Sequence, residues 1–348
     1  MNRQKTRKVK VGNTFIGGDS PITVQSMLNI KANDVENSIL QAVELEKNGC
    51  DIIRIAVPNI EAVRLVSAIK EKISIPLVAD IHFDYKIALE CVSAGIDKIR
   101  INPGNIGDED RVKAVVTACR NKSIPIRIGV NSGSLEKEIL AKYQSPTPEA
   151  LCESALYHVS LLEKYDFEDT IISIKSSDVN TMISAYELMS DECFYPLHLG
   201  VTEAGTYRMG LIKSSIGIGS LLSRGIGDTI RVSLTDEPVK EVEAGRDILK
   251  ALDLKKGVKF VSCPTCGRTS IDLISLAKKV ENELKNIDKD ITVAVMGCEV
   301  NGPGEAREAD IGVAGGKGVG LIFKKGEIIK KVSEENLLSE LMSEIEKL

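Results

Sequence analysis

Residues 76–131 contain three short runs rich in β-branched residues: PLVADIH (76–82), KIRINPG (98–104) and IPIRIGVN (124–131). Each run ends in polar or glycine residues, and segments with helical periodicity, such as 109–120, lie between the runs. A strand that is followed by a helix and then by another strand is the repeating unit of a parallel sheet. This stretch therefore predicts a repeated βα unit.

The same unit recurs from residue 21 to residue 250. Eight such units in about 230 residues match the size and rhythm of a (β/α)₈ TIM-type barrel. A doubly wound open sheet is the alternative, because the number of strands does not prove closure. We expect a barrel over residues 1–250, with a hairpin at 8–18 as a plug beneath it. The other five runs are PITVQSM (21–27), DIIRIAV (51–57), TIISIKSS (170–177), PLHLGVTE (196–203) and TIRVSL (229–234).

The rhythm changes after residue 250. A polar link at 251–257 precedes a smaller α+β domain at 258–348, for which we expect four strands and a terminal helix at 333–348. Cys263 and Cys266 follow the first of these strands in the motif CPTC, and Cys298 follows the second. Because neighbouring strand ends can meet, these three sulfurs form a candidate metal site.

The ligand count distinguishes the possible metals. Three thiols with no fourth cysteine or histidine in this domain suit a [4Fe–4S] cluster with one distinct iron, whereas a structural zinc site takes four such ligands. A pair of redox-active thiols is a further alternative. The tight turn NGPGE (301–305) could bring Glu305 back as an oxygen ligand, or leave it as a surface carboxylate.

In TIM-type barrels the chemistry lies at the C-terminal ends of the strands. Several basic side chains occur there within apolar strands, and a buried guanidinium requires an anion. Asp80, Asp228 and Glu203 could supply it internally; otherwise a ligand such as a diphosphate would. Glu203 is also a candidate proton donor. The strand-end residues expected at the barrel mouth include Arg54, His82, Arg100, Arg127, Asn131, Lys175, His198, Arg231 and Ser233.

Composition excludes several classes of function. The net charge is −5, aromatic residues make up 4% and tryptophan is absent, so neither a basic footprint nor stacking platforms for nucleic acid are expected. No apolar run is long enough to cross a bilayer, and no apolar stretch follows the basic N-terminus. The eight cysteines are then best explained as reduced thiols, and we expect a cytoplasmic protein.

Eight motifs together closely resemble the 4-hydroxy-3-methylbut-2-enyl diphosphate synthase family of the methylerythritol phosphate route to isoprenoids. The resemblance covers nearly the whole chain. One departure is LNIK (28–31), where the family usually has a threonine-rich run. The motifs are VQSM (24–27), VADIHFDY (78–85), RINPGNIG (100–107), IRIGVNSGSLEK (126–137), PLHLGVTEAG (196–205), GIGDTIRVSLT (225–235), CPTC (263–266) and GCEVNGPGEA (297–306).

This resemblance implies a two-electron reductive ring opening and dehydration of 2-C-methyl-D-erythritol 2,4-cyclodiphosphate, with flavodoxin or ferredoxin as electron donor. It implies a [4Fe–4S] cluster on Cys263, Cys266, Cys298 and Glu305, and Glu203 as the acid that protonates the intermediate. The implied diphosphate ligands are Arg54, Arg100, Arg127, Asn131, Lys175 and Ser233, with Asn301 added from the cluster domain; His82 and His198 are candidates for substrate contact.

The assembly expected is a homodimer with active sites shared between subunits, each small domain capping its partner's barrel. The link at 251–257 is short for folding that domain back over its own barrel mouth, and the resemblance implies the same arrangement. Two other functions remain open at this stage. One is a redox-neutral iron–sulfur hydro-lyase acting on a phosphorylated small molecule, and the other is a phosphate-binding barrel with a structural metal.

Overall fold

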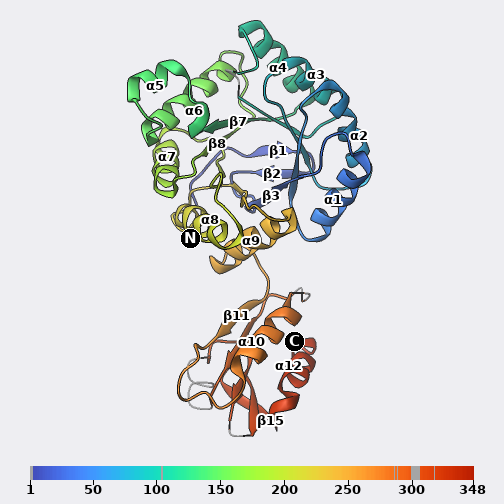
Figure 1. The fold of residues 1–348 in the computed structure, drawn as a ribbon, viewed down its shortest axis with the longest axis vertical. Helices are drawn as coiled ribbons and strands as arrows, with labels where there is room; N and C mark the ends of the chain where they lie inside the picture. The colour runs from blue at the N-terminus through green and yellow to red at the C-terminus, as the bar shows by residue number, and fades with distance from the viewer. Residues whose placement is uncertain (1–2, 103–104, 286, 288, 299–305, 317) are drawn as a thin grey trace. The chain divides into compact units, whose positions relative to one another are not determined.

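The computed structural model describes residues 3–102, 105–285, 287, 289–298, 306–316 and 318–348. The chain divides into two compact units, Met1–Leu254 and Lys255–Leu348, and each forms its own sheet and core. Figure 1 shows the first unit from blue to gold and the second in orange and red.

The first unit is built on a sheet of eight parallel strands in the order β8-β7-β6-β5-β4-β3-β10-β9. A parallel bridge between Ile172 and Leu197 joins the two ends of this sheet. The predicted TIM-type barrel is therefore confirmed, and the open-sheet alternative is wrong. The strands are β3 (Thr23–Met27), β4 (Ile52–Ala56), β5 (Leu77–Asp80), β6 (Lys98–Ile101), β7 (Ile126–Asn131), β8 (Thr170–Lys175), β9 (His198–Leu199) and β10 (Thr229–Ile230).

Helices surround the barrel (Figure 1). Many begin at an aspartate whose side chain accepts a hydrogen bond from a main-chain N–H of the first turn, which is why the helices start where they do. These caps are Asp34, Asp84, Asp108 and Asp178. The helices are α1 (Val35–Lys47), α2 (Arg64–Lys70), α3 (Tyr85–Ser93), α4 (Glu109–Lys122), α5 (Lys137–Tyr143), α6 (Pro148–Glu163), α7 (Val179–Glu192), α8 (Tyr207–Leu222) and α9 (Pro238–Ala251), with short 3₁₀ helices η1 (Ile60–Val63) and η3 (Ser132–Ser134).

The alternation of side chains along each strand separates the core from the site. In β7, Ile126, Ile128 and Val130 pack in the main hydrophobic core, whereas Arg127 and Asn131 belong to the opposite face. Successive residues of a strand point to opposite sides of the sheet, so the apolar set faces the helices and the polar set faces the barrel interior. The barrel thereby directs charged groups inward.

The N-terminal hairpin pairs β1 (Val9–Val11) with β2 (Thr14–Ile16) and turns at Gly12, which has a φ of +57°. Its apolar residues pack against residues at the beginning of three barrel strands, β4, β5 and β8, as expected for a plug under the barrel. This cluster consists of Val9, Val11 and Ile16 with Ile52, Val78 and Ile171.

The second unit contains a five-stranded sheet in the order β11-β12-β13-β14-β15, parallel from β11 to β13 and antiparallel from there on. Helices α10 (Leu273–Leu284) and α12 (Leu337–Glu346) contribute to its core. The strands are β11 (Lys259–Ser262), β12 (Thr292–Met296), β13 (Ile311–Gly315), β14 (Val319–Lys324) and β15 (Glu327–Ser333), and η4 (Glu334–Asn336) precedes α12.

Strand β15 was not predicted, and the terminal helix begins at Leu337 rather than at residue 333. The strand lies at the edge of its sheet and is largely exposed, so its sequence EIIKKVS carries no buried face that periodicity could reveal. Throughout the described part of the chain, no helix has both the length and the apolar character required to cross a bilayer.

Candidate active site

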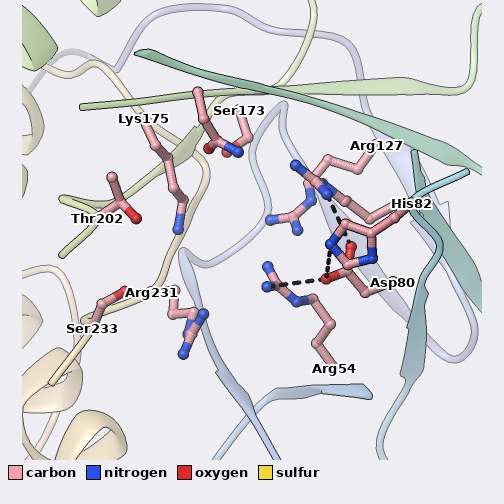
Figure 2. Close-up of a pocket in the computed structure, with 11 residues that line it drawn as sticks. Arg54, Asp80, His82, Arg127, Ser173, Lys175, Thr202, Arg231 and Ser233 are labelled. Atoms are coloured by element: carbon pink, nitrogen blue, oxygen red, sulfur yellow. Dashed lines mark hydrogen bonds and ion pairs between the residues drawn. The ribbon is translucent and has the colours of Figure 1, made fainter. Parts of the chain in front are cut away.

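A cavity of about 140 Å³ lies at the C-terminal ends of the barrel strands (Figure 2). Five of its lining residues are arginine or lysine, and one is a carboxylate. Most of the residues predicted at the mouth come together here. The lining residues are Arg54, Asp80, His82, Arg100, Arg127, Asn131, Ser173, Lys175, Thr202, Arg231 and Ser233.

Asp80, at the end of β5, organises one side of the cavity. Its Oδ2 lies 3.3 Å from Arg54 Nη2 and its Oδ1 lies 3.2 Å from Arg100 Nη1, while His82 Nε2 is 3.8 Å away (Figure 2). Burial favours the neutral form of Asp80, but Arg54 and Arg100 outweigh it and lower the pKa of this carboxyl. Asp80 is therefore the internal anion for Arg54 and Arg100, which was one of the two alternatives expected for the buried guanidinium groups.

Gly129 of β7 leaves space for the guanidinium of Arg100. A Cβ on Gly129 would lie 2.4 Å from Arg100 Nε, so any other residue there would force this guanidinium to move from its present position beside β7. Arg100 Nη2 also donates to the Gly129 carbonyl at 3.2 Å. Burial lowers the pKa of Arg54 to about 10, although the charge of Asp80 opposes this shift.

Arg127 differs from Arg54 and Arg100 because no carboxylate in the described part of the chain pairs with its guanidinium. It is 1% exposed, and its Nε and Nη1 have no hydrogen-bond partner among the described residues. Burial, and then the charges of Arg54 and Arg100, lower the pKa of Arg127 well below its usual value. Burial and the nearby Arg231 lower the pKa of Lys175 in the same way. A bound anion would relieve the cost of holding both charges.

Arg231 was predicted at the mouth, but the resemblance did not give it a role. It lines the cavity and pairs with Glu241 of α9, which sequence reasoning missed. In the sequence, Glu241 resembles the acidic residues that are common in the first turn of a surface helix. A signal was nevertheless present, because helical periodicity places Glu241 on the same face as the buried Gly245 and Ile248.

Two other predicted residues do not line the cavity. Glu203 lies in the loop after β9, is exposed, and has a φ of +51°, in the left-handed region that non-glycine residues rarely adopt. His198 is completely buried, and neither ring nitrogen has a partner among the described residues. Burial, then the charges of Arg127 and Lys175, lower the pKa of His198 well below its usual value, which leaves the ring neutral.

Asp228, a proposed mouth carboxylate, pairs instead with the N-terminal segment. Its Oδ1 lies 2.7 Å from Arg3 Nη2 and accepts a hydrogen bond from Thr6 at 2.9 Å. Asp228 precedes β10, so it belongs to the N-terminal ends of the strands. The expectation that it neutralises the arginines of the cavity is therefore wrong.

In the second unit, Cys263 and Cys298 follow the adjacent parallel strands β11 and β12. Cys263 Sγ accepts a hydrogen bond of 3.2 Å from the Gly297 N–H. The Arg268 main-chain N–H and then the Arg268 side chain lower the pKa of the exposed Cys266 thiol. N–H donors that favour thiolates fit the ligands of an iron–sulfur cluster.

Within the described ranges, no three cysteine, histidine, aspartate or glutamate side chains are grouped so that they could hold a metal ion. Glu305 and Asn301, both predicted to act with these cysteines, lie outside the described residues. The remaining five cysteines are free thiols in the barrel unit. Cys50, Cys91, Cys119 and Cys152 are buried, and Cys193 is partly buried.

Comparison with known families assigns both units. Residues 6–246 match the GcpE TIM-barrel domain, and residues 259–347 match the GcpE protein C-terminal domain. The chain belongs to the GcpE family. The resemblance predicted from the motifs is thereby confirmed.

Curated relatives of this GcpE chain are similar over their full length. A protein of Clostridium perfringens is 62% identical over 347 residues, and one of Clostridium acetobutylicum is 63% identical over 347 residues; the alignments cover 99% of each chain. Both relatives are named 4-hydroxy-3-methylbut-2-en-1-yl diphosphate synthase (flavodoxin).

Solved structures support the barrel fold alone. The 3-dehydroquinate dehydratase of Geobacillus kaustophilus matches 72% of this GcpE chain and 98% of its own, with a TM-score of 0.53 and 14% identity. The Yersinia pestis dihydropteroate synthase matches 72% of this chain and 100% of its own, with a TM-score of 0.52 and 13% identity.

Proposed function

We propose that this GcpE-family chain is an oxidoreductase that converts 2-C-methyl-D-erythritol 2,4-cyclodiphosphate to 4-hydroxy-3-methylbut-2-enyl diphosphate in isoprenoid biosynthesis. The observation that carries the proposal is the charge of the cavity, where five basic residues face one carboxylate. A diphosphate supplies the missing negative charge and offers oxygens that match guanidinium forks. The names of the relatives that match over their full length support the same reaction.

The side chains of the cavity have distinct tasks in this reaction. Arg127 and Lys175 bind the diphosphate as charges without a carboxylate partner among the described residues. Arg231 binds it while paired with Glu241, and Arg54 and Arg100 bind it from positions held by Asp80. Asn131, Ser233 and His82 complete the polar lining. Glu203 donates a proton to the intermediate, and Asn301 binds substrate from the second unit; for His198, substrate contact stays a prediction.

Cys263, Cys266, Cys298 and Glu305 would hold a [4Fe–4S] cluster. When bound, it supplies the electrons for the reduction one at a time. The relatives' names point to flavodoxin as the donor, with ferredoxin as the alternative. Reduced thiols are consistent with the cytoplasm as the compartment. We further propose a homodimer with active sites shared between subunits.

The test combines metal analysis with turnover under anaerobic conditions. We expect iron and acid-labile sulfide in the purified protein, and conversion of the cyclic diphosphate that depends on reduced flavodoxin. Turnover of a phosphorylated substrate without any reductant would favour the hydro-lyase. Absence of iron and sulfide from anaerobically purified protein would favour a binding barrel with another metal.

A further inference from the structure

Glu241 lies on the buried face of α9 and is not among the residues that line the cavity. It is only 4% exposed, yet its carboxylate accepts four hydrogen bonds. Arg231 Nε donates to Oε2 at 3.3 Å and Arg231 Nη2 donates to Oε1 at 3.2 Å. The Leu234 N–H donates to Oε1 at 3.1 Å, and Ser26 Oγ donates to Oε2 at 3.0 Å.

These contacts hold Arg231, the segment at Leu234 and strand β3 in fixed positions relative to one another. Two donors of one guanidinium bind the two oxygens of one carboxylate, and this sets the plane of the Arg231 group as well as its position. The bond to Leu234 holds the segment that follows β10, next to Ser233 in the cavity lining. Ser26 links the same carboxylate to β3, the neighbour of β10 in the barrel.

A carboxylate this close to an anion site has two opposing effects. Its negative charge partly neutralises Arg231, so by Coulomb attraction alone its removal would tighten anion binding. Its hydrogen bonds hold Arg231 in one geometry, so its removal would also leave a long side chain to be ordered by the ligand. The direction of the change on substitution therefore reveals which effect dominates.

We infer that Glu241 is a positioning residue, which holds Arg231 and the 233–234 segment in the geometry that receives the diphosphate without itself touching substrate. This inference rests on the proposed function. Four hydrogen bonds to one buried carboxylate favour positioning over simple charge balance, because a group that only balanced charge would not need contacts to Ser26 and Leu234.

The first test compares Glu241→Gln with Glu243→Gln in the full-length holoenzyme. Glu243 lies on the same helix, is 41% exposed and pairs with Lys240, so its variant controls for the loss of one helix charge. Inorganic pyrophosphate, titrated by calorimetry, probes the anion site, and turnover of the cyclic diphosphate gives KM and kcat. Thermal midpoints monitor folding.

Glu241→Gln is expected to weaken pyrophosphate binding and raise KM by about five- to twenty-fold, with a smaller change in kcat. The control should match the wild type. Equal or tighter binding in Glu241→Gln would overturn the positioning role. A wild type that binds pyrophosphate but never turns over the cyclic diphosphate would count against the proposed function, while the binding comparison would still decide the role of Glu241.

A double-mutant cycle tests whether Glu241 acts through Arg231. In an Arg231→Met background, Glu241→Gln should cost less than about two-fold in pyrophosphate affinity, because no guanidinium remains to be positioned. An undiminished loss in that background would overturn the inference. If Glu241→Gln does not fold, Glu241→Asp is used in the same cycle; it keeps the charge, so weaker binding there must come from altered geometry.

Discussion

The main-chain N–H of Gly297 donates a hydrogen bond of 3.2 Å to Cys263 Sγ. The two residues come from the ends of the parallel strands β12 and β11, which pair from Lys259 with Thr292 to Ser262 with Val295. Register thus places the CPTC motif beside the residue that precedes Cys298. This relationship links two cysteine segments that are far apart in the sequence, and it favours a shared ligand site.

Replacing Cys298 by alanine should remove the visible absorbance of the cluster and leave the barrel folded. Cys298 belongs to a compact unit with its own sheet, so the barrel core does not depend on it. Anaerobic absorbance spectra with iron analysis measure the first effect, and circular dichroism measures the second. Cys193→Ala is the control, since this partly buried thiol lies in the barrel. Full cluster content in Cys298→Ala would contradict the ligand assignment.

Arg127→Ala should weaken substrate binding by roughly 1.5–3 kcal/mol, and Arg127→Lys should weaken it less. Alanine removes a buried guanidinium, two nitrogens of which have no partner among the described residues, whereas lysine keeps the charge and loses the fork. KM and calorimetric affinity for the cyclic diphosphate measure the difference. Wild-type affinity in both variants would show that the guanidinium of Arg127 does not contact the ligand.

The barrel and its basic mouth were predictable because they follow from local rules. Strand β7 alternates isoleucine and valine with Arg127, Gly129 and Asn131, so the sequence alone predicts which of its residues face the barrel interior. The closure of the barrel could not be predicted from the sequence. It depends on the bridge between Ile172 and Leu197, which joins the two ends of the eight-stranded sheet. Sequence spacing carries no information about that contact.

The partners of the charges were harder to predict than the charges themselves. Asp80 and Asp228 both flank barrel strands, yet the first pairs with Arg54 and Arg100 and the second with Arg3. Whether a residue begins or ends a strand decides at which end of the barrel it lies. Glu241 was not predicted, because a glutamate in the first turn of a helix is usually a surface residue. Its partner Arg231 follows β10, and the sequence does not show that these two side chains meet.

Glu203→Gln should bind substrate with near-normal affinity and turn over very slowly. The amide keeps the shape of the side chain and loses the acidic proton, so ground-state binding survives while protonation fails. Single-turnover kinetics and calorimetric affinity separate the two effects. Glu237→Gln, at the N-cap of α9, serves as a control carboxylate. Turnover of Glu203→Gln within a few-fold of the wild type would remove Glu203 from the role of acid.

Glu136 predicts a pH dependence of barrel stability. Burial opposes its charged form, but His158 Nε2 at 2.6 Å and Ser154 Oγ at 2.7 Å outweigh burial and lower the pKa of Glu136 to about 2. A carboxyl whose pKa is lower in the folded state stabilises the fold above the unfolded pKa of about 4.3, and this contribution is lost as pH falls towards 2.

Glu136→Gln should therefore lower the free energy of unfolding by roughly 2–3 kcal/mol at pH 7. The difference from the wild type should shrink progressively between pH 4.5 and pH 2. Urea unfolding of the barrel at several pH values measures both quantities. Glu138→Gln is the control, because Glu138 is an exposed carboxylate in the first turn of α5, the helix that Glu136 precedes. A difference that stays constant with pH would contradict the lowered pKa.

The shared-site homodimer predicts complementation between a variant that binds substrate weakly and a variant that lacks the cluster, assayed at a substrate concentration too low for the first variant to bind. Arg127→Ala damages the barrel and Cys298→Ala damages the cluster domain, and the two chains are co-expressed so that subunits pair at random. About half of the dimers are then mixed, and each mixed dimer contains one site with neither lesion if sites form between subunits. Activity should recover to about a quarter of the wild-type value. Sites formed within one chain would each carry a lesion. Differential tags demonstrate the mixed dimers, and a mixture no more active than its parents would then refute the shared site.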